Sequence, residues 1–257
     1  MYSEGKIDGI DFLTNEYAII RNEAGEIVDK VIQHADGKLH QIRYATFKNS
    51  YTGLMKPRNE HQELAFDMLK DSTITVKLIT GTWGTGKTMA LVVAALEAVG
   101  RGEFEKIIWV RNNVQVKDTD NLGALPGDQY DKMLPYLGPF MDHVGGEDGV
   151  KMLIEHDQLE VIPLGFLRGR SIRNSIIICS EAENLTKEHL QLLMGRVDEG
   201  SALWIDGDVR QRDRVAFEKS KGLETMIDRL KGEPLFGYVH LVKSERSATA
   251  RLADKLN

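Results

Sequence analysis

Residues 81–88 read Gly81-Thr82-Trp83-Gly84-Thr85-Gly86-Lys87-Thr88 and complete the pattern GxxxxGK[ST]. A β-branched, apolar run over 74–80 precedes this stretch and predicts a buried strand. A run rich in alanine and leucine over 89–98 follows it and predicts a helix. A strand, a glycine-rich loop and a helix in this order make a phosphate-binding loop, whereas an accidental glycine-rich turn would need neither neighbour.

Each residue type in this loop has a physical task. The glycines let backbone N–H groups curl around phosphate oxygens, and the helix N-terminus adds partial positive charge. Lys87 is placed to reach the β- and γ-phosphates, and the Thr88 hydroxyl is a ligand for Mg²⁺. We therefore expect residues 81–88 to hold a nucleoside triphosphate together with Mg²⁺.

The composition is that of a globular protein, with 42% hydrophobic and 28% charged residues in 257. No stretch approaches the ~18 apolar residues that span a bilayer, and the N-terminus lacks a secretory signal pattern, so no membrane partner is expected. The single cysteine, Cys179, excludes an internal disulfide and is typical of a reducing cytoplasm.

The formal net charge is −6, which argues against nucleic-acid binding through a bulk positive field. A local basic groove is still compatible with this charge. Two groups of arginines are candidates; a solvated face is the alternative for each, and it is the favoured one for the second group. They are Arg168, Arg170 and Arg173, and Arg210, Arg212 and Arg214.

The pattern of predicted secondary structure changes near residue 50. Residues 1–50 are predicted to form a small β meander, and 48–57 have the composition of a linker. Its predicted strands are 17–21, 27–32 and 39–44. From Arg58 onward, predicted strands and helices alternate, which indicates an α/β domain over 51–257 with a mostly parallel sheet and helices on both faces.

The elements predicted for this second part can be given by their ranges. The helices are 59–70, 128–144, 186–196, 223–230 and one from 247, and the later strands are 106–111, 159–163, 175–179, 202–205 and 238–242. The stretch 112–127 is too long and polar for an ordinary connection, which favours a functional role. Ligands of such sheets bind at the carboxyl ends of the strands.

A nucleotide hydrolase also needs a carboxylate near the metal and a group that activates water. Ser180-Glu181 follow the strand predicted over 175–179, where most such enzymes have Asp-Glu. Glu181 is therefore the candidate general base, and the alternative is an ordinary acidic residue in the next helical turn. After the following strand, Asp208 and Gln211 are candidates for sensing the γ-phosphate or positioning water, although Gly-Asp pairs are also common in plain turns.

Several motifs support a family resemblance in their order along the chain. They are Gln62, Leu122-Gly123-Ala124-Leu125-Pro126-Gly127-Asp128 with Lys132 and Pro135-Tyr136, Arg168-Gly169-Arg170-Ser171, Ser180-Glu181-Ala182-Glu183-Asn184, and Gly207 to Asp213. Over about 57–257 the chain resembles the PhoH family, whose members are ATP-binding proteins related to superfamily 1 helicase cores. The Leu-Pro-Gly-Asp segment is the most specific part.

The resemblance implies a P-loop NTPase with a RecA-like core that uses ATP and Mg²⁺. It implies that Gln62 recognises adenine and that Gly84, Gly86, Lys87 and Thr88 hold the phosphates. Arg246 is similar to a late arginine that stabilises charge in cis or from a neighbouring subunit, although an ordinary surface arginine is nearly as plausible. RNA or single-stranded DNA is an implied partner, with Arg111, Arg168 and Arg170 as candidate contacts.

The same resemblance implies homo-oligomers, as hexameric rings. Longer members carry a PIN ribonuclease domain in front of the ATPase. Because this chain is too short to hold one, nuclease activity is not expected.

Three positions depart from the family pattern. The chain has Ser180-Glu181-Ala182-Glu183-Asn184 for Asp-Glu-Ala-Gln-Asn, Arg111-Asn112 for Arg-Pro, and Trp83 inside the loop. Ser180 brings no charge, and losing a partner of a bound metal costs about 10- to 100-fold in affinity or activity. Glu181 and Asp208 are candidates to compensate, and a Ser180→Asp variant is expected to hydrolyse ATP faster.

The sequence therefore favours a slow ATPase that acts on, or is regulated by, RNA or single-stranded DNA. The alternative is a nucleotide-binding switch whose hydrolysis is vestigial because of Ser180. A small-molecule kinase ranks third, since the element Gly207 to Gln211 fits kinases poorly.

Overall fold

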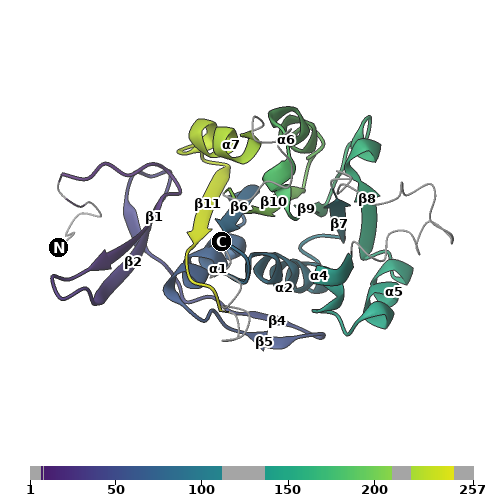
Figure 1. The fold of residues 1–257 in the computed structure, drawn as a ribbon, viewed down its shortest axis with the longest axis horizontal. Helices are drawn as coiled ribbons and strands as arrows, with labels where there is room; N and C mark the ends of the chain where they lie inside the picture. Colours follow the sequence, from purple (N-terminus) through teal and green to yellow (C-terminus); the bar gives the residue numbers. More distant parts are fainter. Residues whose placement is uncertain (1–6, 8, 112–136, 210–220, 246–257) are drawn as a thin grey trace, which may run out of the picture.

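A six-stranded parallel sheet lies at the centre of the computed structural model, which describes residue 7 and residues 9–111, 137–209 and 221–245 (Figure 1). The strand order is β11 (Phe236–Leu241), β6 (Val76–Gly81), β10 (Ala202–Gly207), β9 (Ser175–Cys179), β7 (Lys106–Arg111) and β8 (Leu159–Pro163). All the pairings between these strands are parallel. The parallel α/β fold predicted from the sequence is thus confirmed.

Helices cover both faces of this sheet (Figure 1). On one face lie α1 (Glu60–Lys70), α2 (Lys87–Gly100), α4 (Gly138–Met141) and α5 (Glu147–Glu155), and on the other lie α6 (Lys187–Met194) and α7 (Gly222–Leu230). The strand residues supply both cores by alternation: Ile176 and Ile178 join the first core, and Ile177 and Cys179 join the second. None of the helices that the structure describes is long and apolar enough to cross a membrane.

Local sequence signals explain where the helices begin. The Asn59 side chain accepts a hydrogen bond from the Gln62 N–H and caps α1, as the Asn59–Gln62 spacing predicts. Thr186 caps α6 by accepting from the His189 N–H. Helix α2 is apolar on nearly all sides because it lies between the sheet and a hairpin formed by residues 47–55.

The N-terminal meander is also confirmed. It consists of β1 (Tyr17–Arg21), β2 (Ile27–Gln33) and β3 (Leu39–Gln41), paired antiparallel. Buried Asn15 ties it to the sheet by donating to the carbonyls of Pro234 and Phe236, at 2.9 and 3.0 Å. The N-terminal strands therefore lie beside β11 and α1, at one edge of the central sheet (Figure 1).

The expectation of a linker over 48–57 is wrong. This stretch contains most of a hairpin of β4 (Phe47–Asn49) and β5 (Gly53–Met55), which packs against α2. Phe47 is buried and its ring centroid lies 4.8 Å from that of Phe66. The hairpin therefore spans residue 50, where the sequence suggested a division of the chain.

Other differences concern boundaries. Strand β10 continues two residues beyond the predicted 202–205, so that Asp206 lies within it. Helix α5 was not predicted; its buried face is small, made of Gly149, Val150 and Leu153. Three predicted features lie wholly or mostly outside the described residues: the helix from 247, the stretch 112–127 and the helix 128–144. Of the helix 128–144, the described part contains the short α4.

Candidate functional site

The loop over residues 81–88 connects β6 to α2 in a conformation that needs glycine. Gly86 precedes α2 with φ of 86°, and a Cβ there would lie 3.0 Å from Gln62 Nε2. At Gly81 a Cβ would lie 2.4 Å from the Leu241 carbonyl oxygen. The strand, the loop and the helix thus have the arrangement that the sequence predicts.

Lys87 folds back over this loop. Its Nζ donates to the carbonyls of Gly81 and Thr82, at 2.7 and 2.9 Å. The Thr85 hydroxyl also donates to the Thr82 carbonyl, at 2.8 Å. Trp83, which departs from the family pattern, is 39% exposed. The ammonium group is therefore held at the mouth of the loop, where a phosphate oxygen would compete with the two carbonyls.

Gln62 is buried behind the loop. Its Oε1 accepts from the Arg58 N–H at 2.8 Å, and its Nε2 donates to the Thr85 carbonyl at 2.9 Å. The structure thus brings the predicted adenine-recognising residue against the phosphate-binding loop. Two of its hydrogen bonds are made within the chain, so Gln62 also supports the shape of the loop.

Polar side chains from three elements meet at the carboxyl edge of the sheet. Thr88 Oγ1 lies 3.5 Å from Ser180 Oγ, which joins the start of α2 to the end of β9. Ser180 Oγ in turn donates to Asp206 Oδ1, at 3.3 Å. Because β10 lies between β6 and β9, the end of β10 places Asp206 between the phosphate-binding loop and Ser180.

Asp206 is a residue of this site that sequence reasoning missed. Its side chain is 1% exposed, and Oδ1 also accepts from the Glu181 N–H at 3.2 Å. Oδ2 has no hydrogen-bond partner among the described residues. Burial raises the pKa of Asp206, while the Glu181 N–H, the charge of Lys87 and the nearby hydroxyls lower it. The available signal was a carboxylate at the end of an otherwise apolar strand.

Glu181 directly follows β9 and has an unusual backbone. Its φ and ψ are 55° and 50°, the left-handed region, which costs a residue with a side chain about 1–3 kcal/mol and often marks functional sites. The side chain is exposed at the edge of the site. The geometry therefore presents this carboxylate to solvent just after the end of β9.

Glu183 and Asp208 link the turn after β9 to the end of β10. Glu183 Oε2 accepts from the Asp208 N–H at 3.2 Å, and the Asp208 side chain is buried. Burial raises the pKa of Glu183 to about 7. Glu183 stands where the family pattern has glutamine, and the raised pKa favours the neutral carboxyl, which resembles the glutamine side chain in shape.

Two predicted catalytic residues, Gln211 and Arg246, lie outside the described residues. The residue before Arg246 is described: the Glu245 N–H donates to the Gly84 carbonyl at 2.8 Å. Glu245 Oε1 also accepts from Asn59 Nδ2 at 2.8 Å. The segment after β11 therefore contacts the phosphate-binding loop.

The arginines proposed for nucleic acid have different surroundings. Arg170 makes a two-pronged ion pair with Glu160, with N–O distances of 2.8 and 3.2 Å, and this pairing raises the pKa of Arg170. Arg173 pairs with Asp198 at 2.9 Å. Arg168 is exposed, and Phe166 two residues before it is 71% exposed.

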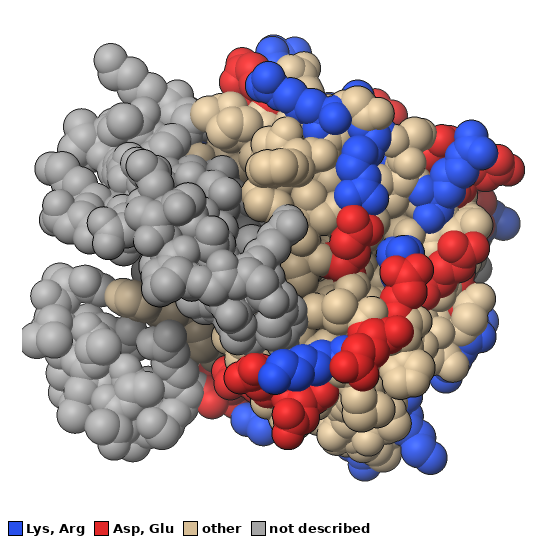
Figure 2. Space-filling model, turned by 90° about the vertical axis from the view of Figure 1, so that its right-hand side faces the viewer, with Lys and Arg blue, Asp and Glu red and all other residues tan. Residues whose placement is uncertain are grey.

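Arg111 ends β7, and its side chain lies outside the described part. On the β8 side of the molecule, the described surface carries basic and acidic side chains interspersed (Figure 2). Arg168 has no ion pair among the described residues, whereas Arg170 and Arg173 each have one, and exposed Phe166 lies close to Arg168 in the chain.

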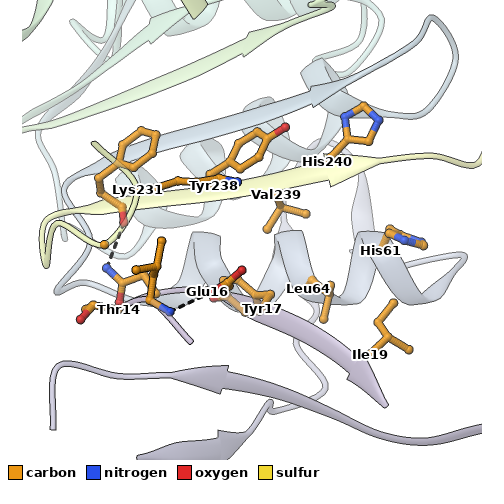
Figure 3. Close-up of a pocket in the computed structure, with 14 residues that line it drawn as sticks. Thr14, Glu16, Tyr17, Ile19, His61, Leu64, Lys231, Tyr238, Val239 and His240 are labelled. Carbon is orange, nitrogen blue, oxygen red and sulfur yellow. Dashed lines mark hydrogen bonds between the residues drawn. The ribbon is translucent and has the colours of Figure 1, made fainter. Parts of the chain in front are cut away.

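A hollow of about 370 Å³ lies away from the loop, between the N-terminal strands and the sheet (Figure 3). Tyr17 and Ile19 line it from β1, His61 and Leu64 from α1, and Tyr238, Val239 and His240 from β11. His240 Nδ1 lies 2.8 Å from the Thr80 hydroxyl, one residue before the phosphate-binding loop. No pattern in the sequence indicates this hollow.

The PhoH-like protein family model matches residues 54–253. The chain belongs to the PhoH-like protein family. Two of its similar relatives are the protein PhoH2 of Bacillus subtilis, 32% identical over 95% of this chain and 57% of the relative, and PhoH2 of Thermobispora bispora, 34% identical over 79% and 47%. This PhoH-like chain thus spans about half the length of the curated relatives it matches.

Solved structures of Pif1 helicases are more distant. Pif1 from Bacteroides bound to single-stranded DNA has a TM-score of 0.36 and 16% identity, over 79% of the PhoH-like chain and 46% of Pif1. Pif1 from Candida albicans has a TM-score of 0.37 and 17% identity, over 77% and 43%. The family and the sheet topology together assign a nucleotide-binding P-loop fold.

Proposed function

We propose that this PhoH-like chain binds ATP with Mg²⁺ and hydrolyses it slowly. The observation that supports this most is the 3.5 Å contact between Thr88 Oγ1 and Ser180 Oγ. It joins the phosphate-binding loop to the strand end from which hydrolases of this fold class draw their carboxylates. Phosphate-holding and water-activating groups thus share one edge of the sheet.

The residues of the loop have separate roles in this proposal. Backbone N–H groups of 81–88 bind the phosphates, and Lys87 neutralises charge on the β- and γ-phosphates. Mg²⁺, when bound, offsets negative charge on the phosphate oxygens. Thr88 and Asp206 are the oxygen donors of this chain that fit such an ion, because one oxygen of Asp206 is buried and has no described hydrogen-bond partner.

Water activation is proposed for Glu181. Its carboxylate is exposed just after the end of β9, and the hydrogen bond from its N–H to Asp206 holds the backbone in place. Asp208 and Gln211 are proposed to position the water or sense the γ-phosphate. Arg246 is proposed as the charge-stabilising arginine, since the preceding residue, Glu245, contacts Gly84 of the loop.

Nucleic acid is the partner that we propose, as RNA or single-stranded DNA. Exposed Phe166 offers a stacking face for an unpaired base, and Arg168 beside it offers a charge for the backbone. The resemblance further supports ring-shaped homo-oligomers as a proposal, and the single cysteine supports a cytoplasmic location.

The second candidate function is a nucleotide switch in which hydrolysis is vestigial. Ser180, at the position where the family has aspartate, favours it. The test is Mg²⁺-dependent phosphate release from ATP by the purified chain, with and without single-stranded RNA, beside ATP binding at equilibrium. Turnover that RNA stimulates supports the ATPase, whereas tight ATP binding without turnover supports the switch. Absence of ATP binding overturns both.

A further inference from the structure

We infer that Asp206, on the strand beside Ser180, supplies the metal-facing carboxylate that Ser180 does not. This inference rests on the proposed function, because it concerns Mg²⁺ held with a nucleotide at the same loop. It differs from the expectation from sequence, in which Glu181 or Asp208 compensates.

The topology places Asp206 where such a carboxylate is needed. Strand β10 pairs with β9 through Ile205 opposite Cys179, so the next residues, Asp206 and Ser180, are neighbours at the ends of parallel strands. On its other side, Asp206 pairs with Ile79 of β6, two residues before the phosphate-binding loop. A carboxylate on β10, which lies between β6 and β9, is therefore placed at the same part of the carboxyl edge as a carboxylate that follows β9.

The contacts of Asp206 link it to the loop. Its Oδ1 accepts from Ser180 Oγ at 3.3 Å, and that hydroxyl lies 3.5 Å from Thr88 Oγ1. The hydroxyl of Thr88, the hydroxyl of Ser180 and the carboxylate of Asp206 thus form a continuous row of oxygens. Mg²⁺ prefers this kind of donor, and it keeps several waters that such groups can hold.

The second carboxylate oxygen of Asp206, Oδ2, is the reason for assigning this residue to the metal ion. Asp206 is 1% exposed, and its Oδ2 has no hydrogen-bond partner in the described part of the chain. A buried polar atom in this state costs free energy that a structural role alone would not justify. A cation, directly or through its water, satisfies this oxygen.

The Ser180 and Asp206 pair allows a reciprocal exchange as a test. Asp206→Ser removes the carboxylate, and the double variant S180D/D206S returns one carboxylate and one hydroxyl with their positions exchanged. Asp148→Ser, on the exposed face of α5, is the matched control for the loss of one negative charge. Asp206→Asn, which keeps the shape of the side chain, is used if the serine variant does not fold.

The readout is binding, not turnover. Mn²⁺ replaces Mg²⁺, and its binding to the complex with ADP is followed by electron paramagnetic resonance, while a fluorescent ADP reports nucleotide affinity in EDTA. We expect Asp206→Ser and Asp206→Asn to lower Mn²⁺ affinity about 10- to 100-fold, with nucleotide affinity in EDTA unchanged. The double variant is expected to regain most of the Mn²⁺ affinity.

Two failures are distinguishable. If the wild type binds Mn²⁺ with ADP and Asp206→Asn binds it equally well, the assignment of Asp206 is overturned and the nucleotide site stands. If the wild type binds no fluorescent ADP with or without the metal, the proposed function itself fails, and the inference fails with it.

Discussion

Ser180 and Asp206 meet across adjacent parallel strands, with Ser180 Oγ 3.3 Å from Asp206 Oδ1. This short distance determines the electrostatic cost of placing a carboxylate at position 180. A carboxylate there would face Asp206, and two carboxylates at such a distance cannot both ionise without cost. Ser180 is therefore compatible with Asp206, and the two positions are expected to vary together.

The first prediction concerns Ser180→Asp alone. The sequence alone predicts faster hydrolysis for this variant. Because Asp206 already supplies a buried carboxylate, we expect no gain in turnover. Without Mg²⁺ the variant should lose about 1–3 kcal/mol of unfolding free energy, and Mg²⁺ with ADP should restore part of it. Urea unfolding with and without these ligands measures this. Turnover well above the wild type would show that Asp206 does not fill the role.

The second prediction concerns Lys77, which is 3% exposed and donates to the Leu69 carbonyl at 2.9 Å. Burial lowers the pKa of Lys77 from its usual 10.5 to about 7. Above pH 7 the unfolded chain therefore binds one more proton at this residue than the folded chain. The contribution of Lys77 to unfolding free energy should rise by up to about 1.4 kcal/mol per pH unit until the unfolded lysine also titrates.

Lys77→Met removes this titration and serves as the comparison. Urea unfolding of both proteins between pH 6 and 9 should show the wild type gaining stability relative to the variant as the pH rises. Curves that stay parallel across this range would mean that Lys77 keeps its charge when folded.

The third prediction separates two roles of Gln62. Because its carboxamide binds the Arg58 N–H and the Thr85 carbonyl, Gln62→Ala should cost about 1–3 kcal/mol of stability for each buried group left unpaired. If Gln62 also recognises adenine, the variant should lose its preference for ATP over GTP. Equilibrium binding of both nucleotides tests this: an unchanged preference in a destabilised variant would limit Gln62 to supporting the loop.

The fourth prediction compares neighbouring residues after β8. Phe166→Ala should weaken single-stranded RNA binding by about 1–3 kcal/mol if a base stacks on the ring. Arg168→Ala should weaken binding and reduce its salt dependence. Arg170→Ala is the matched control, since Glu160 already neutralises that charge. Fluorescence anisotropy at several salt concentrations gives the comparison, and equal effects at Arg168 and Arg170 would argue against this surface.

Much of the fold follows from local signals. The spacing within 81–88 predicted the loop, and Asn59 with Gln62 predicted the start of α1. Strand β9 is buried along its whole length, and its run of isoleucines suits a strand covered on both faces. These features depend on residues close together in the chain, so the sequence alone indicated them.

The missed features depend on distant partners. Asp206 belongs to the site because β10 lies between β6 and β9, an order that no local pattern contains. The Arg168 to Arg173 cluster looked uniformly basic because Glu160 and Asp198 pair with it only in the fold. The β4–β5 hairpin gives no strand signal in the sequence, because its two three-residue strands are too short to show alternation.

The most direct test of the account is phosphate release from ATP in the presence of Mg²⁺, measured for the wild type and Lys87→Ala. Lys151→Ala, on the exposed face of α5, controls for the loss of a positive charge. We expect slow release by the wild type and by Lys151→Ala, and a fall of about 100-fold or more for Lys87→Ala, as for other donors that stabilise transition-state charge. Equal release by the wild type and Lys87→Ala would contradict hydrolysis at this loop.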